Sequence, residues 1–331
     1  MEPEPRHWAP WAPRSSWDGW FAIAVFPKES EIRWLKAHFF RRACAPGRHP
    51  LASVEGMDAI SEMLLVYATR DRQVTVHTAV DPGALSASHE PLAVDLPGRF
   101  RLSGAPPRFA MEFTIPEGGA GARFSFEGGW PIWWAKAGRF LHYVGQHSAA
   151  RVELTEGGAV RTLAGLGVME HACGVSPRKD IRERLPIHFH WDVLAFHTPG
   201  SPLDSAAGLA LMRKGKTCLR ARAAGRLPGY GAMAMKGLEV KYLDFTTALD
   251  PEGRRVAIPV RWEGTLRHRH GVFRYAATAS TPMAPRVPGG GMLGFEFTGQ
   301  WKPADSAPAT WTGTGFAEYG DFAGHLLNLA R

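Results

Sequence analysis

The hydrophobic positions of this 331-residue chain follow a period of two over most of its length. From Ala59 onward, short runs rich in Val, Phe, Trp and Thr alternate apolar with polar residues, and turn-forming pairs such as Gly128-Gly129 separate the runs. Alternation with this period is typical of a strand with one buried face. Many short strands at near-regular spacing indicate a sandwich or an antiparallel barrel. We therefore predict a mostly β protein.

The two ends of the chain depart from this period. Residues 1–27 are rich in Trp and Pro, which predicts an extended arm. Lys28–Arg42 predicts an amphipathic helix, because its apolar residues recur at helical spacing. That stripe consists of Ile32, Leu35 and Phe39. Asp321–Arg331 predicts a short closing helix. Since Lys28–Arg42 is basic, weak contact with a membrane surface is an alternative to packing on the domain.

A short motif, Gly-x-Gly-x-x-Glu-(His/Tyr), occurs once in each half of the chain, at Gly165–His171 and again at Gly313–Tyr319. A dinucleotide fingerprint needs a third glycine and a following helix, and both are missing here. The motif instead predicts a strand whose glycines allow close backbone approach or a bulge. Such a strand presents Glu170 and His171 on opposite faces.

The repeated motif indicates a chain built from two similar halves. Between them lies a charged segment bracketed by prolines, Pro177–Pro186, which we interpret as a linker. The expected domains are residues 1–48 as arm and amphipathic helix, 49–180 as a first barrel, and 181–331 as a second barrel.

Composition narrows the functional classes. The chain has 39 Lys and Arg against 31 Asp and Glu, a formal net charge of +8, but the basic residues are scattered and form no recognised nucleic-acid module. A solvated basic surface without a nucleic-acid partner is expected. Three scattered cysteines fit a reducing compartment rather than a disulfide framework. There is no signal-peptide pattern and no apolar run of roughly 18 residues, so a cytoplasmic location is expected.

Glu170 is the first candidate for chemistry. If its side chain enters an apolar cavity, burial disfavours the charged carboxylate and raises its pKa. A protonated carboxylic acid in a dry pocket can act as a general acid. The alternative is that Glu170 forms an ion pair and that His171 is a packed core residue.

Two aromatic-rich strands supply further candidates. Strict alternation in Ile187–His197 places His188, His190 and Asp192 on one face, which suits the wall of an amphipathic ligand pocket or a strand half exposed to water. His-x-His can supply metal ligands, but no complete ligand set accompanies it, so no metal is expected. His142 and Tyr143, preceded by the aromatic pair Trp133-Trp134, could line a ligand cavity or belong to an aromatic core.

The two motifs carry a resemblance to a known family. The chain resembles the lipocalin-like superfamily that includes carotenoid 1,2-hydratase (hydroxyneurosporene synthase), AttH-type proteins and certain fungal Diels–Alderases. The first-domain motif of that family is matched by Gly165, Gly167, His171 and Gly174, with Glu170 in place of an aspartate. The second-domain motif is matched by Trp311, Gly313, Gly315, Phe316 and Glu318. The start of the Ile187–His197 strand also resembles the beginning of the family's second barrel.

The resemblance implies two consecutive calycin-type antiparallel barrels. It also implies that the motif's carboxylate, here Glu170, protonates a carbon–carbon double bond, with His142 and Tyr143 as helpers. The chain departs from the family pattern at Val168, which replaces an aromatic residue, and at Ala172-Cys173, which replace a Gln/Asn-Trp pair. The same substrate is therefore not implied.

These observations lead to one functional expectation and one alternative. We expect acid-catalysed hydration, isomerisation or cyclisation of an unsaturated lipophilic molecule of isoprenoid or polyketide type, without a cofactor. Glu170 would be the acid, positioned by His171 or His190. The alternative is a non-catalytic carrier that binds a hydrophobic small molecule, in which Glu170 forms a structural ion pair.

Overall fold

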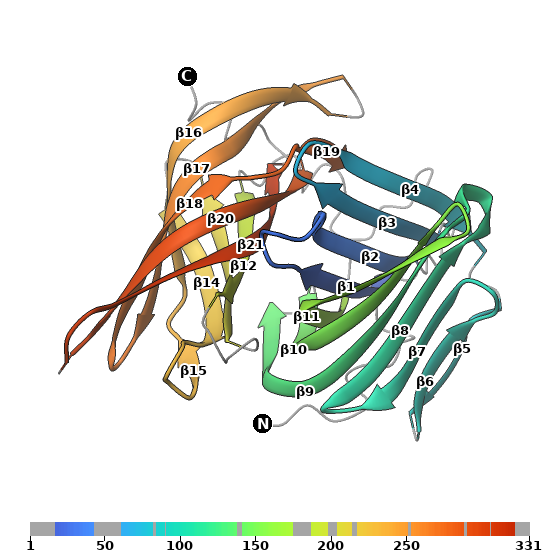
Figure 1. Cartoon of the computed structure of the whole chain (residues 1–331), viewed down its shortest axis with the longest axis horizontal. Coiled ribbons are helices and arrows are strands. Elements are labelled where there is room, and N and C mark those ends of the chain that lie inside the picture. Colours follow the sequence, from blue (N-terminus) through green and yellow to red (C-terminus); the bar gives the residue numbers. More distant parts are fainter. Residues whose placement is uncertain are drawn as a thin grey trace. The chain divides into compact units, whose positions relative to one another are not determined.

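The computed structural model describes residues 17–42, 61–81, 84–89, 91–137, 141–174, 187–197, 204–213, 217–250, 253–287, 290–304 and 306–321. Almost all of these residues lie in antiparallel strands of two curled sheets (Figure 1). A short 3₁₀ turn, η3 (Pro116–Gly118), precedes one strand. Among the described residues, no helix is long and apolar enough to cross a membrane.

The first sheet has eleven strands in the order β4-β3-β2-β1-β11-β10-β9-β8-β7-β6-β5. Its first strand in sequence therefore pairs with its last, and the order ends at β4 and β5. The strands are β1 (Trp17–Val25), β2 (Ile32–Arg42), β3 (Ser61–Thr69), β4 (Gln73–Val80), β5 (Ser86–His89), β6 (Leu92–Leu96), β7 (Phe100–Ala105), β8 (Arg108–Ile115), β9 (Ala120–Ala137), β10 (Leu141–Glu156) and β11 (Ala159–Gly174).

The second sheet has ten strands, in the order β15-β14-β13-β12-β21-β20-β18-β17-β16, with β19 paired to β20. Again the first strand pairs with the last, so both sheets follow the same plan, and the predicted fold class of two consecutive barrel-like β halves is confirmed. The strands are β12 (Ile187–Phe196), β13 (Ser205–Arg213), β14 (Thr217–Arg226), β15 (Ala232–Met235), β16 (Leu238–Leu249), β17 (Arg255–His268), β18 (Gly271–Ala279), β19 (Ala284–Val287), β20 (Gly290–Pro303) and β21 (Ala309–Asp321).

The chain divides into two compact units that follow the sheets with two exchanges. Unit 1 comprises Met1–Phe26, Leu35–Tyr67 and Val74–Lys179, and unit 2 comprises Pro27–Trp34, Ala68–Gln73 and Asp180–Arg331. The turns β1–β2 and β3–β4 thus belong to the second unit. The domain boundary expected at residue 180 falls within 175–186, outside the described residues.

Aromatic contacts show how the first sheet curls. Phe39 on β2 lies 5.0 Å from Phe100 on β7, centroid to centroid, and Trp20 on β1 stacks on Phe39 at 5.6 Å. The strands β2 and β7 are far apart in the strand order, so these rings meet only because the sheet folds back on itself. Phe113 and Phe124 extend the same buried cluster.

The second sheet encloses its own aromatic core in the same way. Phe196 on β12 contacts Phe273 on β18 at 5.5 Å, although β21 and β20 lie between these strands in the sheet. Trp262 and Trp301 are fully buried in this core. An interior filled by large side chains is typical of small barrels.

The motif glycines occupy equivalent places in the two sheets. A Cβ on Gly165 would lie 2.3 Å from the Val25 carbonyl oxygen, and one on Gly313 would lie 2.1 Å from that of Ala195. The second glycine of each motif lies under a phenylalanine ring, of Phe126 in the first sheet and of Phe295 in the second. Close approach, as the sequence predicts, is therefore what these glycines permit.

The helix predicted for Lys28–Arg42 is wrong, because this segment forms a turn followed by strand β2. Leu35, Ala37 and Phe39 occupy alternate positions of β2 and are all fully buried. The apolar residues of this segment therefore fit a strand as well as a helix. Pairing with β1 and β3 decides between the two patterns. The amphipathic helix on which the predicted membrane-surface contact depended is therefore not formed.

The other terminal predictions fall largely outside the described residues. β1 already begins at Trp17, within the expected arm, and residues 1–16 are not described. Asp321, expected to cap a closing helix, is the last residue of β21, and residues 322–331 are not described.

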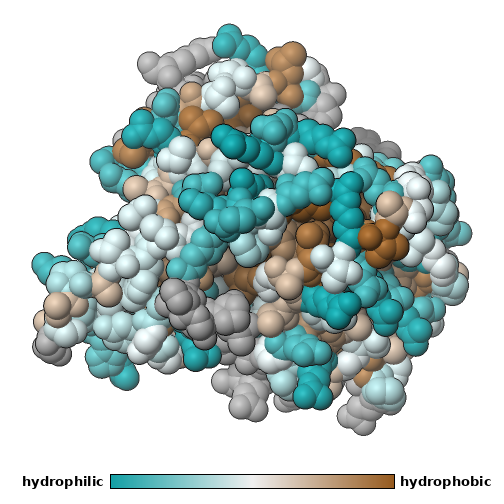
Figure 2. Space-filling model, viewed as in Figure 1, coloured by the Kyte–Doolittle hydropathy of each residue, from teal (hydrophilic) through white to brown (hydrophobic). Residues whose placement is uncertain are grey.

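The surface of the described residues carries few large apolar side chains. Figure 2 shows hydrophilic residues spread over the visible face, with apolar areas between them. The large hydrophobic residues counted as exposed are Val160, Leu243 and Leu249. Single exposed apolar residues are normal on the surface of a folded protein and do not mark a binding site.

Phe39→Ala should destabilise the protein by about 3–5 kcal/mol, because it removes a fully buried ring from the core of the first sheet. Val160→Ala, at a 62% exposed position of β11, should change the free energy of unfolding by less than about 0.5 kcal/mol. Chemical denaturation of both variants tests the assignment. Similar stability of the two would contradict the strand packing of β2.

Candidate functional site

Strand β12 directs its polar side chains into the core of the second sheet. His188, His190 and Asp192 have exposed fractions of 1%, 0% and 0%. The next two residues on that face, Leu194 and Phe196, belong to the hydrophobic core. This face of the strand is therefore buried along its length rather than half exposed to water.

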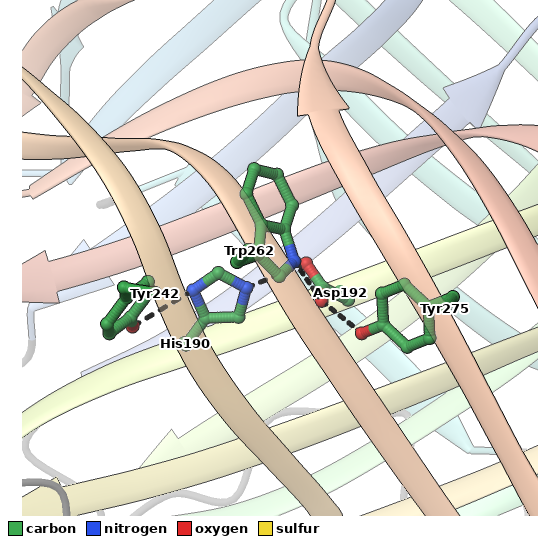
Figure 3. Close-up of polar contacts among 5 residues, drawn as sticks. All are labelled: His190, Asp192, Tyr242, Trp262 and Tyr275. Carbon is green, nitrogen blue, oxygen red and sulfur yellow. Dashed lines mark hydrogen bonds and ion pairs between the residues drawn. The ribbon is translucent and has the colours of Figure 1, made fainter.

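Asp192 lies at the centre of a buried hydrogen-bond network (Figure 3). Its Oδ2 accepts hydrogen bonds from Trp262 Nε1 at 3.0 Å and from the Tyr275 hydroxyl. Its Oδ1 lies 2.9 Å from Nε2 of His190. A carboxylate without such partners would be strongly unfavourable in an apolar core, so the three donors are what permit its burial.

His190 extends the network to a tyrosine. Its Nδ1 lies 3.2 Å from the hydroxyl of Tyr242 on β16. Because Nε2 donates to Asp192, the Nδ1 of a neutral imidazole is left as an acceptor for that hydroxyl. Tyr242 is only partly buried and adjoins a register shift in β16, a feature that re-aims side chains. A hydrogen-bonded chain thus runs from a buried carboxylate to a partly exposed hydroxyl.

A glycine makes room for the second donor to Asp192. Tyr275 on β18 pairs with Gly264 on β17, and a Cβ at position 264 would lie 2.0 Å from the tyrosine ring. Burial, together with the charge of Asp192, raises the pKa of Tyr275 well above its usual value. Tyr275 therefore remains a protonated donor at neutral pH.

In the first sheet, Glu170 and His171 point to opposite faces of β11, as predicted. Glu170, 4% exposed, accepts a hydrogen bond from the Tyr143 hydroxyl. Gly145 is the residue paired with Glu170, and a Cβ there would lie 2.5 Å from that hydroxyl, so the glycine lets the tyrosine ring reach the carboxylate. His171 instead stacks on Trp20 in the core, at 4.9 Å between ring centroids.

The expected positioning of Glu170 by a histidine is therefore not what the structure shows. His171 faces away from Glu170, because neighbouring residues of a strand project to opposite sides. Both ring nitrogens of His190 lie within hydrogen-bond distance of other side chains, those of Asp192 and Tyr242. The described residue that contacts the Glu170 carboxylate through its hydroxyl is Tyr143.

His171 belongs to a buried charged cluster. Asp18, fully buried, accepts hydrogen bonds from Nε and Nη2 of Arg41 at 3.1 and 2.9 Å, and its Oδ1 lies 3.5 Å from His171 Nε2. Burial raises the pKa of Asp18, but the hydrogen bonds and charges of His171 and Arg41 outweigh it and leave the pKa below its usual value.

The same cluster includes Cys173, whose thiol, with the Asp18 carboxylate and the His171 imidazole, offers ligand atoms within 4.8 Å of one another. These are zinc ligand types. However, Arg41 already occupies one oxygen of Asp18, and burial, with the charge of Asp18, raises the pKa of Cys173 to about 12. The set therefore fits a buried ion-pair cluster better than a metal centre.

Three predicted site residues are described only by their backbone. Trp133 and Trp134 lie on β9 and His142 on β10, and Trp133 pairs with Gly145. This places them in strands next to Tyr143, but their side chains lie outside the described part of the structure.

Sequence reasoning did not assign several members of these clusters to a site. They are Asp18, Arg41, Cys173, Tyr242, Trp262 and Tyr275. Trp262 and Tyr275 lie 70 and 83 residues from Asp192, so no local spacing connects them with it. Asp18 was hidden because its segment was interpreted as an arm. The available signal was the polar group at the end of each Trp or Tyr side chain within a strongly apolar strand. Such a group requires a hydrogen-bond partner when it is buried.

Comparison with known proteins establishes the fold. No family model matches the chain, and neither does any curated protein. The chain is similar to the solved structure of an AttH protein from Nitrosomonas europaea, with 10% identity, a TM-score of 0.59 and 93% of both chains covered. It is also similar to kievitone hydratase from Nectria haematococca, with 10% identity, a TM-score of 0.56, and 92% of this chain and 89% of that chain covered.

A third similar structure is that of CghA with Sch210972, with 11% identity, a TM-score of 0.50, and 94% of this chain and 89% of that chain covered. At such identities the likeness concerns the fold. AttH-type proteins are among the relatives that the sequence motifs suggest, so structure and motif point to the same architecture.

Asp192→Asn should invert the tautomer of His190. An asparagine amide that turns its NH₂ toward His190 Nε2 makes this nitrogen an acceptor, so that Nδ1 carries the proton. Long-range ¹H–¹⁵N spectra of the histidine rings detect the change, and His197, which directly follows β12, serves as the internal reference. An unchanged His190 spectrum would contradict the hydrogen bond to Asp192.

His147, on β10, should make stability depend on pH. Burial lowers its pKa to about 4, whereas the unfolded chain titrates near 6.5, so the unfolded state binds more protons between these values. The contribution of neutral His147 to the free energy of unfolding is therefore fully present above pH 6.5. It falls by about 3 kcal/mol as the pH drops toward 4. Denaturation of His147→Gln should show a shallower loss across this window than the wild type or His270→Gln, an exposed control.

Proposed function

We propose that this protein catalyses acid–base chemistry on an unsaturated, lipophilic small molecule of isoprenoid or polyketide type, namely hydration, isomerisation or cyclisation. The observation that carries the proposal is the chain Asp192–His190–Tyr242, in which a fully buried carboxylate orients an imidazole whose other nitrogen meets a partly exposed hydroxyl. A base oriented by a third group is the arrangement that general acid–base catalysis requires.

The chain can deliver a proton with all charges accounted for. With His190 doubly protonated beside the Asp192 carboxylate, Tyr242 gives its hydroxyl proton to one carbon of a double bond while His190 Nδ1 passes its own proton to the tyrosine oxygen. The π electrons form the new C–H bond and leave a cationic carbon. Addition of water then gives hydration, loss of a neighbouring proton gives isomerisation, and attack by an internal hydroxyl gives cyclisation. Attack by an internal double bond also closes a ring but moves the positive charge to a new carbon, which then loses a proton or adds water. The proton released returns to His190 through Tyr242.

Glu170 supplies a second acidic group in the first unit. Its burial and its hydrogen bond from Tyr143 support the role that the family resemblance implies for the motif carboxylate. The likeness in fold to kievitone hydratase, a hydratase by name, supports the same class of reaction. No step in this scheme requires an organic cofactor.

A carrier function is the second candidate. One observation favours it: both carboxylate oxygens of Asp192 have hydrogen-bond partners within the protein, as in a purely structural network. In that case the Tyr242 hydroxyl transfers no proton, and its removal changes only the affinity for the ligand.

Tyr242→Phe should lower turnover by roughly 10²-fold or more while preserving the fold, because it removes only the terminal proton carrier. Mass spectrometry of an organic extract of the purified protein first identifies a lipophilic class. Unsaturated compounds of that class, or an isoprenoid and polyketide panel if the extract is blank, are then incubated with the enzyme in D₂O. Deuterium bound to carbon in the product reports protonation of the double bond.

Tyr230→Phe is the matched control, a partly buried tyrosine of the same unit that packs on Trp301 outside the network. It should retain full deuterium incorporation. Glu170→Gln tests the first unit separately: loss of incorporation in this variant, with Tyr242→Phe unaffected, would assign the proton to Glu170 instead. Undiminished turnover in Tyr242→Phe would remove the Asp192–His190–Tyr242 chain from the mechanism, and a stoichiometric lipophile that never exchanges would favour the carrier.

A further inference from the structure

A hollow of about 480 Å³ lies in the second unit and is lined by none of the residues of the Asp192 network. Its walls come from the β1–β2 turn, from the β3–β4 turn and from the outer side of β18 and β20. Its volume is within the range of small-molecule sites, which is about 300–1,000 Å³. Unlike those sites, it is lined mainly by charged and hydroxyl-bearing side chains.

Three cations converge on this hollow, from Lys28, Arg33 and Arg70. Arg33 carries the clearest signal, because its Nε and Nη1 are shielded from solvent and have no hydrogen-bond partner among the described residues. Guanidinium N–H groups that are shielded from water and lack an acceptor are unfavourable, even where the rest of the side chain reaches solvent. A carboxylate or phosphate in the hollow supplies the missing acceptor, and arginine is the side chain best suited to such groups.

The turn that carries Arg33 is fixed in place. The neighbouring Trp34 is fully buried and donates a hydrogen bond from Nε1 to Thr281 Oγ1 at 3.2 Å. The same oxygen accepts from the backbone N–H of Gly294 at 2.9 Å, and a Cβ on Gly294 would lie 2.6 Å from the Trp34 ring. This side of the hollow is therefore preorganised, which lowers the entropic cost of binding.

The remaining polar groups narrow the ligand class. Thr278 and Ser280 add hydroxyls to the lining, and Glu29 on the β1–β2 turn and Glu296 on β20 add carboxylates. Two carboxylates disfavour a highly charged anion but accept hydrogen bonds from hydroxyl groups. A small anion that also carries hydroxyls matches both parts of the wall.

We infer that this hollow is a binding site for a small hydroxylated anion, anchored by Arg33 with support from Lys28 and Arg70. The ligand class is hydrophilic, whereas the proposed substrate is lipophilic. The site is therefore independent of the proposed function.

Thermal unfolding and calorimetry with defined probes test this site. The probes are gluconate, glucose 6-phosphate and inorganic phosphate, each at the same ionic strength adjusted with NaCl. We expect gluconate or glucose 6-phosphate to raise the unfolding midpoint of the wild type more than phosphate does. The probe that succeeds distinguishes a carboxylate from a phosphate ligand. Arg33→Met should abolish this rise, and Arg70→Gln should weaken binding about tenfold, as for the loss of one charged partner.

Arg222→Gln, at an exposed position of β14 outside the hollow, is the matched control and should respond like the wild type. Without any probe, Arg33→Met should have a higher midpoint than the wild type, because it removes shielded N–H groups that lack an acceptor. A lower midpoint would assign Arg33 a structural role and overturn the inference. Equal rises in all variants, a general salt effect, or no rise with any probe would also overturn it. If Arg33→Met does not fold, the rise in midpoint with each probe is compared between Arg70→Gln and the wild type instead.

Discussion

The second sheet is organised by the requirement to keep one negative charge inside an aromatic core. Asp192 is fully buried, and its carboxylate remains there because donors from three strands, β12, β17 and β18, meet it. These donors also fix the curl of the sheet, since β12 is separated from β17 and β18 by β20 and β21 in the strand order. Loss of a single donor would leave part of a buried charge unmet, which is why such networks tolerate little change.

The two sheets share one topology but carry different clusters of buried polar residues. At corresponding places in the register, Trp20 pairs with His171 in the first sheet and His190 pairs with Tyr319 in the second. The first sheet places an arginine–aspartate–histidine cluster beside stacked aromatic rings, whereas the second builds a hydrogen-bonded chain leading to a tyrosine. The two sheets thus share a strand plan and differ in the polar residues at the junction of their first and last strands.

Sequence patterns predicted what depends on neighbouring residues and missed what depends on distant ones. Alternation in Ile187–His197 placed His190 and Asp192 on one face correctly, and the glycine motifs marked close approach of strands. The partners Trp262 and Tyr275 could not be predicted, because only the curled sheet brings them to Asp192. The prediction of a helix over Lys28–Arg42 was wrong for a related reason. Its apolar residues fit both a helical and a strand period, and pairing with β1 and β3 makes the segment a strand.

Several tyrosine hydroxyls owe their position to a missing methyl group. The ring of Tyr143 crosses Gly145, that of Tyr275 crosses Gly264, and that of Tyr319 crosses Gly291. The direction of each hydroxyl is therefore encoded in a residue that has no functional group of its own. A glycine-to-alanine change at one of these positions would redirect a hydroxyl group while leaving every polar residue of the chain intact. Reactivity in this fold can thus diverge between relatives whose polar side chains are identical.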